Sequence, residues 1–175
     1  RPGQLNYASS GSGAAAHLSA ELFKSMTGVQ MTHVPYKGAA PALTDVLAGQ
    51  CQLIFATSLS VQPYIKTGRL RALAVTTAKR ARANPELPTV AEAGVPGFEA
   101  NTWHGIVVTA HTPAPIITKL NAEVNKVLQR QDVRERIEGL GGEILGGTPE
   151  EFAAYIRSEI PKWTKVVKDS GARAE

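Results

Sequence analysis

Residues 5–22 read "LNYASSGSGAAAHLSAEL", and this stretch decides how the first half of the chain is interpreted. A short apolar segment leads into the small residues "SSGSG" and then directly into an alanine-rich segment. The order predicts a strand, a tight turn and a helix, because glycine permits the turn and alanine favours the helix. A turn of Gly and Ser at the start of a helix exposes backbone N–H groups where an anion is stabilised.

Strands and helices alternate on either side of this stretch. We expect strands at residues 4–8, 29–34, 51–57 and 69–77, and helices at residues 14–28, 40–49 and 58–68. Gly28, Gly49 and Gly68 stand at the expected helix ends, a position that glycine favours because it adopts left-handed backbone angles. Alternation of this kind predicts βαβ units around a parallel sheet, and therefore an α/β fold.

The second half of the chain has a different composition. A proline-rich loop at residues 84–98 marks a boundary, and one strand is expected at residues 102–110. Two amphipathic helices are expected at residues 113–129 and 148–163; the second opens with a capping box in which Thr148 is the N-cap and Glu151 the N3 residue. A lone strand cannot cover the apolar faces of these helices, so we expect them to dock on a sheet that residues 99–175 do not supply.

Composition excludes several classes of function. The 175 residues carry a net charge of +4, but the basic residues are scattered and aromatic residues are 6% of the chain, which argues against nucleic-acid binding. No apolar run approaches the roughly 20 residues that span a bilayer. The single cysteine, Cys51, rules out a disulfide framework and lies in an apolar run, where we expect it to be buried. The four histidines show no metal-ligand spacing, and we expect neither a metal nor a cofactor.

The glycine-serine turn has four possible interpretations. Residues 11–16 fit the dinucleotide pattern G-x-G-x-x-A, but the next strand ends in "THVPYKG" without the acidic residue that would hold a ribose. A serine nucleophile needs glycine two residues before and two after it, and neither Ser10 nor Ser12 has both. The remaining interpretations are a backbone site for a carboxylate and a tight turn without function. His17, one turn into the helix, is expected to pack or to cap.

The longer motifs resemble one family. "HVPYKG", "LPTVAEAGVPGFEANTWHGIVV" and "GGTPEEFAAYIRSEIPKW", together with the opening stretch, resemble the Bug family, the periplasmic receptors of tripartite tricarboxylate transporters. The resemblance covers essentially the whole chain. It implies a periplasmic-binding-protein-like, two-lobed α/β fold that traps a small organic carboxylate between its lobes. It also implies a non-catalytic protein whose partners are the membrane subunits of the transporter, with no nucleic acid involved.

The resemblance further implies how the chain is divided. Residues 1–98 would form one complete lobe, and residues 99–175 would form the C-terminal part of the other. That second lobe would need an N-terminal segment, and the sequence starts abruptly at Arg1. We therefore expect a longer protein with a secretory signal and a periplasmic location, and self-association of the truncated chain. The alternative is a nucleotide-binding α/β domain of an oxidoreductase.

The candidate ligand-binding residues follow the expected strands. They are Ser9, Ser10, Gly11, Ser12, Gly13 and Ala14 in the first turn, Tyr36 and Lys37 after the second strand, and Thr57 and Ser58 after the third. Ligands bind at the carboxyl ends of parallel strands, where all three turns lie. Lys37 could pair with a carboxylate or remain solvated, and Thr57 and Ser58 could instead cap the next helix. Ala14 and Ala15 replace the usual Ser-Pro of the family, so Ser12 is a candidate cap.

Overall fold

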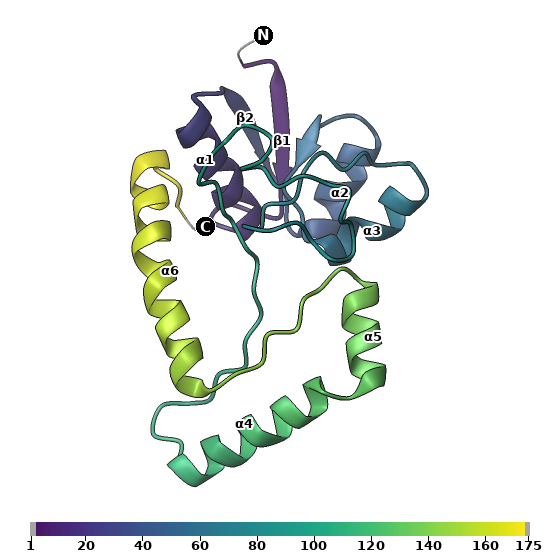
Figure 1. Ribbon diagram of the computed structural model, residues 1–175. Coiled ribbons are helices and arrows are strands. Elements are labelled where there is room, and N and C mark those ends of the chain that lie inside the picture. Colours follow the sequence, from purple (N-terminus) through teal and green to yellow (C-terminus); the bar gives the residue numbers. More distant parts are fainter. Residues whose placement is uncertain (1–2, 174–175) are drawn as a thin grey trace.

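The computed structural model describes residues 3–173, so the expected lobe limits at residues 1 and 175 lie outside the described part. Three parallel strands form its sheet, in the order β2-β1-β3 (Figure 1). The strands are β1 (Leu5–Ser9), β2 (Met31–Pro35) and β3 (Leu53–Ile54). Tyr7 of β1 pairs with His33 on one side and with Leu53 on the other.

Each strand is followed by a helix, which confirms the expected βαβ alternation. The helices of this part are α1 (Ala15–Thr27), α2 (Ala39–Leu47) and α3 (Ser58–Lys66). The later helices are α4 (Ala114–Leu128), α5 (Gln131–Gly139) and α6 (Pro149–Ser170). Gly28 ends α1 with a φ of 71°, the left-handed conformation expected at that position.

Two expected strands are wrong. Residues 69–77 contain a single bridge, from Val75 to Thr89, rather than a strand. Residues 102–110 form no strand, and Ile106 is 70% and Val107 78% exposed. A strand needs a neighbour to take up its N–H and C=O groups. Residues 69–77 have one only around Val75, and residues 102–110 have no strand partner among residues 3–173. Sequence alternation detects an extended backbone but not its partner.

The sheet buries different residues of β1 on its two faces. Tyr7 packs with Ala20 of α1 and Met31 of β2 on one face. Ala8 packs with Ala42 of α2 and Cys51 on the other face. Successive side chains of a strand point to opposite faces, so one helix covers each side. Cys51 is 2% exposed, as expected from its apolar neighbours.

Helix α6 joins the two halves of the chain. Trp163 of α6 packs against a third apolar cluster, which is formed by Val90, Phe98 and Ala100 beside Phe23 of α1. The yellow α6 runs next to α1 in Figure 1, while α4 and α5 lie apart from the sheet. The last turns of the chain therefore pack on the first βαβ unit, across the expected boundary at residue 98.

The first half of α6 makes different contacts. Thr148 and Glu151 form the expected capping box: the Thr148 hydroxyl accepts from the Glu151 amide at 3.1 Å, and the Glu151 carboxylate accepts from the Thr148 amide at 2.8 Å. Phe152 meets the Trp103 ring edge-on at 5.4 Å between centroids. None of the helices in residues 3–173 is long and apolar enough to cross a membrane.

Phe98 provides a test of this packing. It is 1% exposed in the cluster that Trp163 covers, so Phe98→Ala is expected to lower the free energy of unfolding by about 3–5 kcal/mol. The matched variant Phe98→Leu, which keeps most of the volume, is expected to lose less than about 1.5 kcal/mol. Urea unfolding followed by circular dichroism gives both values, and equal small losses would contradict the cluster.

Candidate functional site

Three strand-to-helix turns surround a small hollow at the carboxyl edge of the sheet. The hollow has a volume of about 50 Å³ and is lined by Ser10, Ala16, Ala39, Leu43, Ile54, Phe55, Ala56 and Ser60. These residues come from the ends of β1 and β3 and from the first turns of α1, α2 and α3. The N-termini of three helices therefore converge on one hollow, whose side chains are apolar except for Ser10 and Ser60.

The starts of these three helices lack the usual acidic or capping side chains. Helices α1, α2 and α3 have no acidic residue in their first turn, and no N-cap side chain accepts a hydrogen bond from a backbone amide of its helix. By contrast, α6 begins with Glu150, Glu151 and a capping box. The first N–H groups of a helix have no carbonyl partner within the helix, and they carry partial positive charge. The hollow is thus an electropositive edge built from backbone amides.

The glycine-serine turn is held by bonds within itself. Gly11 and Gly13 have φ angles of 140° and 78°, which are easily adopted only by glycine. The Gly11 amide donates to the Ser9 hydroxyl at 3.2 Å, and the Gly13 amide donates to Nδ1 of His17 at 3.0 Å. The Ala14 amide donates to the Gly11 carbonyl at 3.2 Å.

The backbone N–H groups available to a ligand lie in the first turn of α1 rather than at Gly11, Gly13 and Ala14. Three amides of the turn, those of Gly11, Gly13 and Ala14, already have partners. Ala14 is the N-cap of α1, and the first amide bonded within the helix is that of Leu18, to the Ala14 carbonyl. The amides of residues 15–17 therefore lack a partner inside the helix, and Ala16 lines the hollow.

The candidate serines of the glycine-serine turn occupy two different environments. Ser9 is fully buried, and its hydroxyl contacts Nε2 of His33 at 2.6 Å. Ser10 lines the hollow, and its carbonyl accepts from the Gly38 amide at 3.0 Å. Ser12 is partly exposed at the tip of the turn. Ser9 thus supports the turn from behind, whereas Ser10 and Ser12 lie on its open side.

The turn between β2 and α2 contacts the glycine-serine turn through its backbone and not through the Tyr36 side chain. The Tyr36 hydroxyl donates to Asp45 at 2.7 Å, a bond that raises the pKa of Tyr36 and turns its hydroxyl toward α2. The Tyr36 amide donates to the Ser9 carbonyl at 3.1 Å, and a side chain at Gly11 would approach the Tyr36 carbonyl to 3.4 Å. Lys37 is exposed and makes no ion pair within residues 3–173.

The third turn lies at the rim of the hollow. Thr57 is the N-cap of α3, and its hydroxyl contacts that of Ser60 at 3.2 Å rather than capping an amide. Ser58 begins α3 next to Gly141: a Cβ built on that glycine would lie 2.9 Å from the Ser58 Cβ. The loop between α5 and α6 therefore reaches the rim from the other half of the chain.

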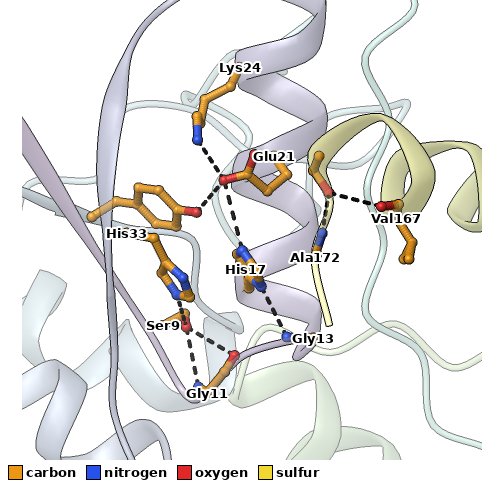
Figure 2. Close-up of polar contacts among 11 residues, drawn as sticks. Ser9, Gly11, Gly13, His17, Glu21, Lys24, His33, Val167 and Ala172 are labelled. Carbon is orange, nitrogen blue, oxygen red and sulfur yellow. Dashed lines mark hydrogen bonds and ion pairs between the residues drawn. The ribbon is translucent and has the colours of Figure 1, made fainter. Parts of the chain in front are cut away.

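A buried polar network lies beneath the first turn (Figure 2). The His17 and His33 rings stack with 3.9 Å between centroids, and Tyr7 stacks on His33 at 4.9 Å. The Tyr7 hydroxyl donates to Glu21 at 2.6 Å, and Lys24 donates to the same carboxylate oxygen at 2.7 Å.

Burial and the neighbouring charges set the protonation of this network. Burial lowers the pKa of His17, outweighing the opposing effect of Glu21. Burial alone would raise the pKa of Glu21, but the hydrogen bonds from Lys24 and Tyr7 outweigh it and the pKa is lowered. Burial, followed by the bond to Glu21, raises the pKa of Tyr7. The network therefore holds a neutral histidine and an ionised glutamate at neutral pH.

Sequence reasoning missed most of the wall of the hollow. Ala39, Ile54, Phe55 and Ala56 carry no chemical signal, although Ala56 could have been found from its place at the end of the third strand. The partnership of His17 with Gly13 is a capping contact of the kind expected for His17. The contact of His33 with Ser9 joins residues 24 positions apart, and predicting it would have required the register between β1 and β2.

Comparison with known proteins gives one consistent family. Residues 1–172 match the family described as "Tripartite tricarboxylate transporter family receptor". The protein BugT of Bordetella pertussis (strain Tohama I) is 36% identical over 173 residues, which cover 99% of this chain and 53% of BugT. The chain spans about half the length of the curated relatives it matches first.

Solved structures agree with this family and with the α/β fold of periplasmic binding proteins. A protein of R. palustris, solved with adipate, has a TM-score of 0.90 and 42% identity, covering 98% of this chain and 57% of that one. MatC of Rhodopseudomonas palustris, with bound malate, has a TM-score of 0.79 and 33% identity, covering 94% and 57%. The interpretation as a nucleotide-binding domain of an oxidoreductase finds no support in these relatives.

Tyr7→Phe tests the buried network. Removing the hydroxyl takes one hydrogen bond from the Glu21 carboxylate, and the expected loss in the free energy of unfolding at pH 7 is about 1.5–3 kcal/mol. Because the folded pKa of Glu21 lies below its ordinary value of 4.5, its contribution is present above pH 4.5 and is lost as the pH falls through the folded pKa. The variant is expected to lose less stability over that window.

Denaturant unfolding between pH 7 and pH 3 measures both effects. Tyr64→Phe is the control: the Tyr64 ring lies under Arg69 at 5.5 Å, and phenylalanine keeps that ring. Its expected change is within about 0.5 kcal/mol. Wild-type stability and an unchanged acid slope in Tyr7→Phe would contradict the network.

Proposed function

This chain belongs to the tripartite tricarboxylate transporter receptor family, and we propose that the intact protein captures a small organic carboxylate at the amide-lined hollow. Delivery would be to the membrane subunits of a tripartite transporter. The observation that carries the proposal is the convergence of three helix N-termini without acidic residues on one hollow. Each such helix end contributes roughly 0.3–2 kcal/mol to holding a negative charge.

The proposed ligand chemistry matches the wall as well as the donors. The hollow combines backbone amides with Ala39, Leu43 and Phe55, which suits a carboxylate attached to a short aliphatic chain. Relatives solved with adipate and with malate support this class of ligand. No acid, base or nucleophile is needed for capture, and the proposed role is therefore binding rather than catalysis. A periplasmic location is proposed from a relative described as a periplasmic binding protein, BugD.

The ten candidate residues divide into three proposed roles. Ser9 and Tyr36 position the turns from behind, through their bonds to His33 and Asp45. Five residues face the ligand or its approach; they are Ser10, Ser12, Lys37, Thr57 and Ser58. Because Gly11, Gly13 and Ala14 have bonded amides, we propose that they shape the turn while the amides of residues 15–17 bind the carboxylate.

Substitutions at Ala14 separate charge from helix capping. Ala14 is the N-cap of α1 and its side chain caps nothing, so Ala14→Ser and Ala14→Asp should each stabilise the helix, by about 0.5–2 kcal/mol. Only aspartate also places a negative charge at the proposed carboxylate site. Both capping side chains compete with the ligand for one amide, but only aspartate also repels the ligand carboxylate, so Ala14→Asp is expected to lose roughly 1–4 kcal/mol more affinity than Ala14→Ser.

The measurement is calorimetric titration of the intact receptor and both variants with adipate and with malate, beside thermal melts. The melts establish that both variants fold. If Ala14→Asp binds as tightly as Ala14→Ser, the carboxylate does not lie at this turn and the proposal fails.

We also propose that the rest of the receptor covers the exposed apolar surface of the second half. Residues 1–98 would then form one lobe and residues 99–175 part of the other, with α6 packing on both. The apolar side chains of this surface are exposed in the described part of the chain; they are Ile106, Val107, Ile116, Leu120, Val127 and Leu145. Surface of this kind promotes association, so we expect the 175-residue chain alone to self-associate.

Val107→Asp tests whether the rest of the receptor covers this apolar surface. Val107 is 78% exposed, and in the isolated chain, at a concentration low enough to keep it monomeric, the substitution should change stability by less than about 0.5 kcal/mol. In the intact receptor it would bury an unpaired charge, with an expected loss of about 3 kcal/mol or more. Chemical unfolding of both proteins gives the comparison, and equal effects would show that the residue stays exposed.

A further inference from the structure

The side chains of two histidines lie directly beneath the turn that precedes α1, outside the proposed ligand contacts. His17 is 7% exposed on α1, and His33 lies on β2. Their rings are nearly parallel, with an angle of 9° and 3.9 Å between centroids (Figure 2). Each ring is linked to a different glycine amide of the turn: His17 directly, and His33 through Ser9.

The bond from Gly13 fixes the proton arrangement of His17. The Gly13 amide donates to Nδ1 at 3.0 Å, so Nδ1 must be unprotonated. A neutral imidazole then carries its proton on Nε2, which lies 3.8 Å from the Glu21 carboxylate. Glu21 therefore favours the tautomer that leaves Nδ1 free to accept, as a second partner commonly does for histidine.

Ser9 links His33 to the other glycine amide of the turn, that of Gly11. The Ser9 hydroxyl accepts from the Gly11 amide at 3.2 Å and donates to the Gly11 carbonyl at 3.1 Å. The direction of its 2.6 Å contact with Nε2 of His33 follows the His33 tautomer, and in either direction the hydroxyl keeps a lone pair for the Gly11 amide. Both glycine amides of the turn are thus held inward by acceptors that the stacked histidines provide or orient.

We propose that His17 is a positioning residue for carboxylate binding: its unprotonated Nδ1 holds the Gly13 amide and so aims the first amides of α1 at the hollow. The inference rests on the proposed carboxylate site. Without the bond, the Gly13 amide would lose its buried acceptor and the turn could reorient around its two glycines. The side chain of His17 touches no ligand in this proposal; it fixes the direction of the backbone donors that do.

Protonation of His17 would abolish this role. A proton on Nδ1 would face the Gly13 N–H, and the cation would lie against the His33 ring. Glu21 and Lys24 on α1, Tyr7 on β1 and His33 on β2 face His17. Asp169 of α6 lines a separate pocket together with Glu21 and Lys24. Burial and Lys24 lower the pKa of His17 against the attraction of Glu21, so the ring accepts the Gly13 bond at neutral pH and loses it on acidification.

Two substitutions separate the acceptor from the ring. In His17→Asn the side-chain oxygen takes the place of Nδ1, so the acceptor is kept, the stacked ring is lost and no proton is taken up. In His17→Phe the ring is kept and the acceptor is lost. If the acceptor positions the turn, Asn preserves carboxylate binding and Phe weakens it by about tenfold, the value of one hydrogen bond. If the stacked ring is what matters, the order is reversed.

The first arm of the experiment needs no ligand. Nitrogen-15 NMR of the intact receptor at pH 7 should report His17 as the tautomer with its proton on Nε2. The Gly13 amide should exchange about tenfold faster in His17→Phe than in wild type or His17→Asn. The tautomer with the proton on Nδ1, or equal exchange in all three proteins, would overturn the inference whatever the receptor binds.

The second arm measures affinity for adipate and malate between pH 7.5 and pH 5. The ratio of wild-type to His17→Asn affinity is expected to fall as the pH drops below 6.5, the ordinary pKa of histidine; taking the ratio removes protonation of the ligand itself. Wild-type binding that His17→Phe leaves intact would overturn the positioning role. A wild-type receptor that binds neither acid would count against the proposed function instead, and the first arm would then decide the inference.

Discussion

The parallel sheet imposes the constraint on which the rest of this structure depends. Strands that run in the same direction end at the same edge, and the chain must leave each one there to begin its return helix. Here β1, β2 and β3 therefore deliver α1, α2 and α3 to one edge, with their positive ends together. A site for an anion follows from this topology before any side chain is considered, and the absence of acidic residues in the three first turns leaves it unneutralised.

The turn between β1 and α1 then needs support that glycine cannot provide. Gly11 and Gly13 allow the required angles but leave the backbone free to change. The buried bonds of Ser9, His17 and His33 restrict it, and Tyr7, Glu21 and Lys24 satisfy the polar groups below. A buried network of this kind is stabilising only while each member has a partner, which links the protonation of His17 to the shape of the turn.

Much of the first half could be predicted from sequence, because local signals and fold agree there. The glycines that end the helices and the apolar strands between them give the order of β1 to α3. The strands expected at residues 69–77 and 102–110 are absent because pairing depends on a neighbour and not on the segment itself. The ends of the strands located the candidate turns, but amide partners, such as Nδ1 of His17 for Gly13, depend on backbone geometry that composition does not encode. The placement of Trp163 on the first βαβ unit is likewise a long-range contact.

The central claim is that backbone amides at the start of α1 hold the carboxylate. The most direct measurement is a map of amide proton shifts in the nitrogen-15-labelled intact receptor during titration with adipate and malate. An amide that donates to a carboxylate moves downfield, and we predict saturable downfield shifts at Ala15 and Ala16, together with the first amides of α2 at Ala39 and Ala40. Saturable shifts confined elsewhere, such as at the separate pocket beside Glu21 and Asp169, would contradict the account.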